Sequence, residues 1–131
     1  MPLLIDTKLN SDFGSLDQVG HIVDELTQTA ELDEEAQDAL MLGLSEAVAN
    51  AIMHGNKQDP NKRIHLRAEQ VDGNLEVTVE DEGDGFDPDQ VPSPLTTDNK
   101  MRQGGRGVFL MRTYCKDVRF SNGGRALTLV V

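Results

Sequence analysis

The sequence of 131 residues has little cysteine and little positive charge. Its single cysteine, Cys115, excludes an intrachain disulfide and a zinc site built from cysteines. Only 12 lysines and arginines accompany 23 aspartates and glutamates, which gives a formal net charge of −11. Binding to nucleic acid without sequence preference, or to an anionic membrane surface, needs a basic patch. The composition therefore argues against both kinds of partner.

Long hydrophobic runs are also missing. No stretch approaches the roughly 20 apolar residues of a transmembrane helix, and the first residues show no basic region followed by an apolar segment. We therefore expect a cytoplasmic protein that contacts neither membrane nor nucleic acid directly. The length suits one compact domain, and no repeat or linker divides it. The sequence thus predicts a single domain over residues 1–131.

Hydrophobic periodicity predicts an α+β fold. In chain order, the pattern predicts a strand over 3–9, helices over 16–32 and 33–54, strands over 63–71 and 75–80, a long loop over 82–104, a helix from 105, and strands over 118–120 and 126–131. Asp33 is the expected N-cap of the second helix, and Gly55 is well placed to end it. The economical packing is a two-layer sandwich, with three helices on one face of a mixed, mostly antiparallel sheet.

The end of the second predicted helix carries an unusual polar stripe. Glu46, Asn50 and His54 are four residues apart and so lie along one helical face. That face borders an apolar arc formed by Met41, Leu44, Val48, Ala51 and Ile52. A carboxylate and an amide would then be half-buried at the edge of the core, although ordinary boundary positions also explain them. His54 is interpreted as a structural residue at the helix end.

A second polar feature stands where a strand ends. The period of two places Asp81 on the same face as Leu75, Val77 and Val79, so this acid points toward the core side. In the segment Asp81-Glu82-Gly83-Asp84-Gly85, the glycines allow a ligand to approach the backbone closely. An EF-hand calcium loop is excluded, because its third and fifth positions would be glycines. An ordinary acidic turn and the floor of a ligand site both remain open.

The third feature is the glycine cluster Gly104-Gly105-Arg106-Gly107 before a helix. Free amide groups at a helix start, together with the helix dipole, favour a phosphate, although such clusters also form plain turns. The chain contains no Walker A pattern, and no dinucleotide-binding glycine fingerprint follows a strand. A nucleotide would therefore bind in neither of those two ways.

Taken in chain order, the three features are more specific than any one alone. The segments Glu46-x-x-x-Asn50-Ala51-x-x-His54-Gly55, Asp81-x-Gly83-x-Gly85 and Gly105-Arg106-Gly107-x-x-Leu110-Met111 resemble the N, G1 and G2 boxes of the GHKL ATPase superfamily. This superfamily includes gyrase, Hsp90-type chaperones, histidine kinases and MutL, and has the Bergerat ATP-binding fold. Within it, the chain resembles the small RsbW-type anti-sigma factors that are serine-protein kinases. The resemblance covers nearly the whole chain.

The resemblance implies ATP and Mg²⁺ as cofactors and gives roles to individual residues. Asn50 would hold Mg²⁺, and Glu46 would be the general base that accepts the proton of a serine hydroxyl. Asp81 would accept a hydrogen bond from the adenine amino group, and Gly83 and Gly85 would shape the adenine slot.

The remaining implied contacts come from the last third of the chain. Gly105, Arg106 and Gly107 would bind phosphate at the helix start, and Thr128 would make a second adenine contact. Apart from the resemblance, the length of the loop and its glycines and prolines predict that residues 86–104 form a lid that is mobile without nucleotide and more ordered with it.

The function implied is that of a MgATP-dependent anti-sigma factor that phosphorylates a serine of a small anti-anti-sigma (STAS-type) partner. It would sequester a sigma factor when that partner is unavailable. The alternative is a non-catalytic, ATP-binding switch that sequesters a partner protein. A detached ATP-binding domain of a histidine kinase is a third interpretation, while the absence of an upstream dimerisation helix with a phosphorylatable histidine disfavours a complete one. A homodimer is one oligomeric state that the resemblance allows.

Overall fold

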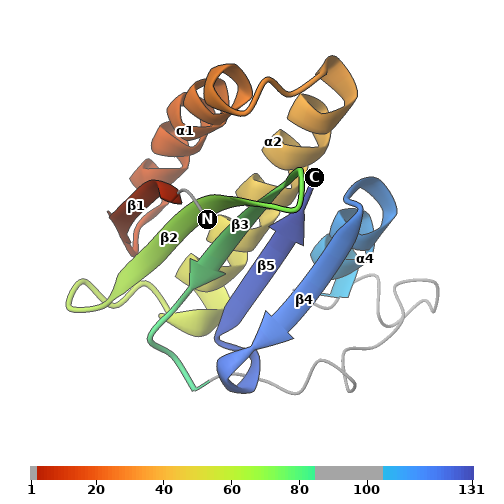
Figure 1. The fold of residues 1–131 in the computed structure, drawn as a ribbon. Helices are drawn as coiled ribbons and strands as arrows, with labels where there is room; N and C mark the ends of the chain where they lie inside the picture. The colour runs from red at the N-terminus through yellow and green to blue at the C-terminus, as the bar shows by residue number, and fades with distance from the viewer. Residues whose placement is uncertain (1–2, 85–104) are drawn as a thin grey trace.

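The structure is a computed structural model that describes residues 3–84 and 105–131, with side chains in the last helix described from Leu110 onward. Its elements are β1 (Leu3–Asn10), η1 (Phe13–Ser15), α1 (Leu16–Thr29), α2 (Glu34–Asn50), η2 (Ala51–Gly55), β2 (Arg63–Val71), β3 (Asn74–Glu80), α4 (Gly105–Tyr114), β4 (Asp117–Ser121), η4 (Asn122–Gly124) and β5 (Ala126–Val130). The three long helices cover one face of the sheet and leave the other face open (Figure 1). The predicted α+β two-layer sandwich is confirmed.

The five strands are arranged in the order β1-β2-β3-β5-β4. Each described pair is antiparallel, so the expected mixed character of the sheet was wrong for this part of the chain. Short turns explain the pairings β2–β3 and β4–β5. Asp72 and Gly73 both have positive φ, at 52° and 82°, as a two-residue type I′ hairpin turn requires.

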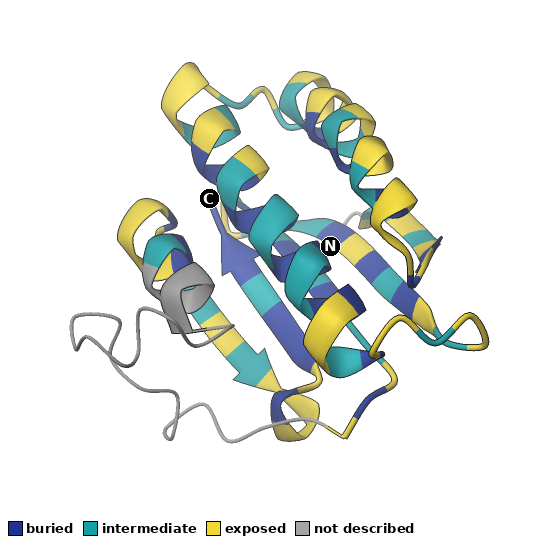
Figure 2. Ribbon diagram, turned by 180° about the vertical axis from the view of Figure 1, so that it is seen from behind, coloured by how far each residue is buried: buried dark blue, intermediate teal, exposed yellow. Residues whose placement is uncertain are grey.

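The core lies between the sheet and the helices. Leu75, Val77 and Val79 of β3 are buried and alternate with half-buried polar residues, as the period of two predicts. In Figure 2, the exposed positions of α1 and α2 lie on the outer sides of the helices, while β5 is buried along nearly its whole length. Cys115 is a core residue, and burial raises the pKa of its thiol to about 11.

The helix α2 is central to this core. The Asp33 carboxylate caps its start by accepting a hydrogen bond from the Ala36 N–H at 2.8 Å, as predicted. Of the predicted apolar arc, Leu44, Val48, Ala51 and Ile52 are buried, whereas Met41 is 38% exposed. Met41 lies instead in the contact with α1, where its Cε is 4.0 Å from the point at which Gly20 would carry a Cβ.

Both predicted helix ends need adjustment. The first helix stops at Thr29, three residues before the predicted end, and Glu31 then takes a left-handed φ of 53°. The second is α-helical to Asn50 and continues as the π-helical turn η2. The Asn56 N–H donates to the carbonyl of Ala51, five residues earlier, at 2.8 Å. Among the described residues, every helix is too short or too polar to cross a membrane.

Two helical glycines have very different surroundings and provide a test of the packing. A Cβ at Gly43 would lie 3.1 Å from Leu129 Cδ1 and 3.2 Å from Cys115 Sγ, whereas one at Gly20 would meet nothing closer than 4.0 Å. We expect Gly20→Ala to raise the free energy of unfolding by about 0.5–1 kcal/mol, because alanine favours a helix. Gly43→Val should lower it by about 1–3 kcal/mol through overpacking.

Urea denaturation, compared at an unchanged m value, measures both effects. A Gly43→Val variant as stable as the wild type would show that the contact between α2 and β5 has room for a side chain.

Candidate functional site

The end of α2 and the end of β3 meet through two glycines. A Cβ at Gly55 would lie 2.3 Å from Asp81 Cγ, and a Cβ at Gly83 would lie 2.0 Å from the carbonyl oxygen of Gly55. Both separations are far below a van der Waals contact, so a side chain at position 83 would displace the backbone of Gly55, and one at position 55 would displace the Asp81 side chain. Gly55 therefore does more than end a helix, because it brings the turn that continues α2 into contact with Asp81, directly after β3.

Asp81 has the core-facing position that the period of two predicts, and it is half-buried. Its Oδ1 accepts a hydrogen bond from the Gly83 N–H at 2.8 Å, and its own N–H donates to the Arg125 carbonyl at 2.9 Å. Among the described residues, Oδ2 accepts no hydrogen bond. Burial raises the pKa of this carboxyl above its ordinary value, against the opposing effects of the Gly83 N–H and of the charges of Arg125 and Lys62.

Sequence reasoning missed Asn56, which is only 1% exposed. Its amide donates to Ser11 Oγ at 2.8 Å and to the Arg63 carbonyl at 3.0 Å, and it accepts from the Glu82 N–H at 2.7 Å. An asparagine that follows a glycine at a helix end is typical of an exposed turn. No periodicity signals its burial, because it lies outside both the helix and the strands.

The polar stripe on α2 is half-buried at Glu46 and at Asn50, as expected. These residues stand one helical turn apart at the end of α2 that leads to Gly55. His54 lies in η2 and is exposed, so the stripe does not continue past Asn50. The described structure therefore places a carboxylate and an amide together on the helix that approaches Asp81.

The predicted phosphate site coincides with a helix start. Gly105, Arg106 and Gly107 are the first three residues of α4, where backbone N–H groups have no partner within the helix. Gly85 and the expected lid at 86–104 lie outside the described residues.

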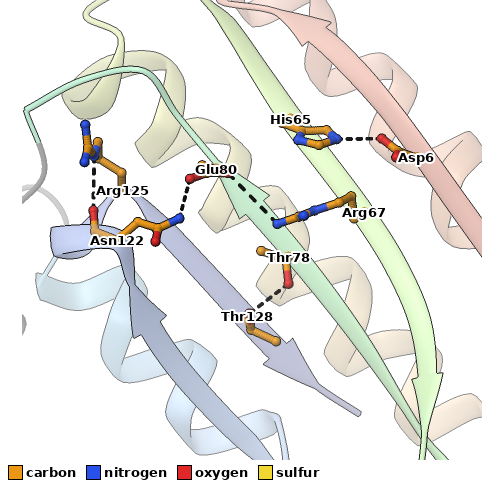
Figure 3. A network of polar contacts seen from close by, with 8 residues as sticks. All are labelled: Asp6, His65, Arg67, Thr78, Glu80, Asn122, Arg125 and Thr128. Carbon is orange, nitrogen blue, oxygen red and sulfur yellow. Dashed lines mark hydrogen bonds and ion pairs between the residues drawn. The ribbon is translucent and has the colours of Figure 1, made fainter. Parts of the chain in front are cut away.

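Thr128 is not brought together with Asp81. Its Oγ1 lies 2.8 Å from Thr78 Oγ1, its partner across the β3–β5 pair. Thr78 alternates with Val77 and Val79, which face the helices, so both threonines lie on the open face of the sheet. Figure 3 shows them there among other polar pairs, including His65 with Asp6. The expected adenine contact from Thr128 is therefore not supported, because Thr128 and Asp81 lie on opposite faces of the sheet.

The donor set at the end of α2 suits Mg²⁺. The described residues contain no group of three or more histidine, cysteine, aspartate or glutamate side chains that could hold a metal. Mg²⁺ does not need such a group, because it usually takes one or two protein oxygens and completes its shell with phosphate oxygens and water. Asn50 offers an amide oxygen for this purpose, and the Glu46 carboxylate one turn away adds negative charge that favours a cation, so the residues present fit the ion.

The antiparallel sandwich, the glycine contact at Asp81 and the helix start at Gly105 together define an α+β domain of the GHKL ATPase class. Comparison with known families agrees. The family described as the histidine kinase-like ATPase domain matches residues 9–131, so this chain belongs to that family.

Two relatives and one solved structure are similar to this chain. The serine-protein kinase RsbW of Bacillus subtilis is 38% identical over 95 residues, which cover 68% of this chain and 59% of the relative. An anti-sigma F factor of Shouchella clausii is 38% identical over 78 residues, covering 58% and 53%. The chain thus spans less than two thirds of these relatives. The RsbU and RsbW domains of a Mycobacterium tuberculosis protein share the fold over all of this chain and 32% of that one, with a TM-score of 0.68 and 20% identity.

The raised pKa of Asp81 predicts a pH-dependent stability. The folded protein holds this proton more tightly than the unfolded chain, so the contribution to stability is present at low pH and is lost as the pH rises through the folded pKa. An Asp81→Asn variant keeps an oxygen for the Gly83 N–H but does not titrate. We therefore expect its stability relative to the wild type to increase as the pH rises from about 4 to about 7.

Thermal unfolding without nucleotide, followed by circular dichroism at several pH values, measures this difference. A difference that is constant or shrinks toward neutral pH would contradict the assigned environment of Asp81.

Proposed function

We propose that this chain is an ATP-dependent protein-serine kinase that acts on a small anti-anti-sigma (STAS-type) partner and sequesters a sigma factor in the cytoplasm. The observation that carries the proposal is the junction of α2 with β3. There, close glycine contact holds a half-buried carboxylate, whose Oδ2 accepts no hydrogen bond from the described residues, at the end of the helical segment that carries Glu46 and Asn50. The names of the relatives, a serine-protein kinase and an anti-sigma F factor, support the same function.

Adenine recognition is assigned to Asp81. Its Oδ1 is occupied by the Gly83 N–H, while Oδ2 has no donor among the described residues, so Oδ2 is available to the adenine amino group. Partial burial strengthens such a hydrogen bond, because water competes less for the carboxylate. Gly83 and Gly85 would border the adenine ring, where the absence of side chains leaves the backbone open to it.

Phosphate binding is assigned to the start of α4 and to the end of α2. The first backbone amides of α4, at Gly105, Arg106 and Gly107, and the helix dipole favour the phosphate oxygens. Asn50 would supply the protein ligand to Mg²⁺. When bound, this ion neutralises charge that develops on the phosphates during transfer. That contribution matters in a chain with a formal net charge of −11.

Phosphoryl transfer would then need only a positioned base. The oxygen of the partner's serine attacks the γ-phosphorus, the bond from this phosphorus to the β–γ bridging oxygen breaks, and ADP departs. The serine proton passes to the Glu46 carboxylate. Glu46 and Asn50 stand one turn apart on α2, so the base and the metal ligand can face the same phosphate from one rigid element.

A non-catalytic ATP-binding switch is the second candidate. It would use Asp81 and Asn50 in the same way but would not need a carboxylate at position 46. The half-buried Glu46 therefore favours the kinase. The proposal also includes a homodimer, which the resemblance allows. Light scattering would measure this oligomeric state.

Nucleotide binding can be tested directly at Asp81. We expect Asp81→Asn to weaken ADP binding by about tenfold or more, because an amide at this position can present a donor to the adenine amino group. Isothermal titration calorimetry with Mg²⁺ and ADP measures the affinity. Thr128→Val is a matched control, since Thr128 lies on the opposite face of the sheet and should leave the affinity unchanged. Equal affinity in wild type and Asp81→Asn would remove Asp81 from the binding site.

The two residues on α2 should differ in what they contribute. Glu46→Gln keeps the shape of the side chain but cannot accept a proton, so phosphotransfer should fall roughly 10²–10⁴-fold while nucleotide affinity stays close to that of the wild type. Asn50→Ala removes the metal ligand, so Mg²⁺-dependent nucleotide binding and phosphotransfer should fall together. Phosphoserine on an added STAS-type partner, quantified by mass spectrometry, measures the transfer.

Sigma-factor binding separates the two candidate functions. The Glu46→Gln protein should still retain a sigma factor in a pull-down, because sequestration requires no proton transfer. A Glu46→Gln protein that phosphorylates its partner at the normal rate would favour the switch.

A further inference from the structure

Asn56 joins four separate segments of the chain. It follows η2 directly, its amide group donates to Ser11 after β1 and to Arg63 at the start of β2, and its Oδ1 accepts from Glu82 after β3. Ser11 continues the network by donating from its hydroxyl to the Lys62 carbonyl at 2.7 Å. Every polar atom of the Asn56 side chain is therefore satisfied within a site that is 1% exposed.

Only a carboxamide matches these partners. The site presents a carbonyl and a hydroxyl oxygen to one side of the group and a backbone N–H to the other. An aspartate would lack both donors, and a serine or an alanine would leave buried groups without partners. The same pattern fixes the orientation of the amide, since the reverse orientation would place two donors together.

The hydrogen bond from the Glu82 N–H to Asn56 restrains the backbone beside Asp81, the residue to which the proposed function assigns adenine recognition. The Glu82 N–H belongs to the planar peptide that links Asp81 to Glu82, so holding this group fixes the backbone immediately after Asp81. The next N–H, that of Gly83, is the donor that orients the Asp81 carboxylate. The Arg63 N–H adds a second restraint by donating to the Glu82 carboxylate.

We propose that Asn56 is a positioning residue for base recognition, which holds the Asp81 carboxylate at the adenine amino group. This role rests on the proposed function, and it adds a residue outside the three motifs. Asn56 adjoins Gly55, whose carbonyl touches Gly83, so the same residue aligns the end of α2 with the loop after β3.

The test is the preference for ADP over inosine diphosphate, which carries an oxygen where adenine carries the amino group. Calorimetry on the full chain should show that Asn56→Ala lowers this preference by about tenfold while Mg²⁺ dependence persists. In the Asp81→Asn background, Asn56→Ala should change the preference no further, because a residue that acts through Asp81 has no effect once that carboxylate is gone.

Ser11→Ala is the matched control. Ser11 is also buried, at 3% exposed, and belongs to the same network, but its loss leaves the bond between Asn56 and Glu82 in place. This variant should lose stability and keep the base preference. Asn56→Asp, which retains an acceptor for Glu82 and loses the two donors, should likewise keep more of the preference than Asn56→Ala.

Two results would overturn the role of Asn56. One is an Asn56→Ala protein that is destabilised but retains the wild-type base preference. The other needs no variant: the Glu82 amide of the wild type should exchange slowly with solvent, and exchange at the rate of a free peptide would show that the bond does not hold the loop. A wild type that binds neither nucleotide, or binds both equally, would instead overturn the proposed adenine contact and with it the proposed function.

Discussion

The approach of two backbones at Gly55 and Gly83 is the constraint on which the rest of the candidate site depends. A helix and a strand of a two-layer sandwich are normally separated by their side chains, but here the carbonyl of one glycine lies where the other would carry its Cβ. The contact brings the end of α2 within reach of Asp81.

This contact also explains why a carboxylate is tolerated on the core side of a strand. Asp81 loses part of its hydration, which raises its pKa, and recovers some of the loss through the Gly83 N–H. The Asp81 carboxylate is therefore less well solvated than a carboxylate on the surface, and it is better placed to accept a hydrogen bond from a ligand. Such local cost is common where a protein keeps a group ready for a ligand.

Most of the fold could be predicted, because the physical signals were local. Alternation identified Leu75, Val77 and Val79 as the buried face of β3, and the same period placed Asp81. The cap at Asp33 could be predicted for the same reason, because its signal lies within one helical turn. The motif residues at the ends of α2 and β3 were identified through their resemblance to the GHKL ATPase boxes. Membership of the histidine kinase-like ATPase domain family is confirmed.

What could not be predicted depends on contacts between distant segments. Asn56 gives no periodic signal, and its partners Ser11 and Glu82 lie 45 and 26 residues away in the sequence. Thr128 was assigned to the site although the pairing with Thr78 puts it on the other side of the sheet, a distinction that requires the strand register. Met41 was assigned to the core because helical spacing cannot tell a sheet contact from the edge of a helix–helix groove.

The π-helical turn at Ala51–Gly55 has a consequence for how this site can vary. A π turn holds one residue more than the α-helical turn it replaces, so it shifts the phase of everything after it relative to the helix before it. Glu46 and Asn50 precede the shift, whereas Gly55 ends the π turn and Asn56 follows it. The orientation of the proposed catalytic residues is thereby set before the π turn, and the position of the glycine contact is set after it begins. Substitutions in α2 would then change the orientation of the proposed catalytic residues while the contact between Gly55 and Gly83 stayed in place.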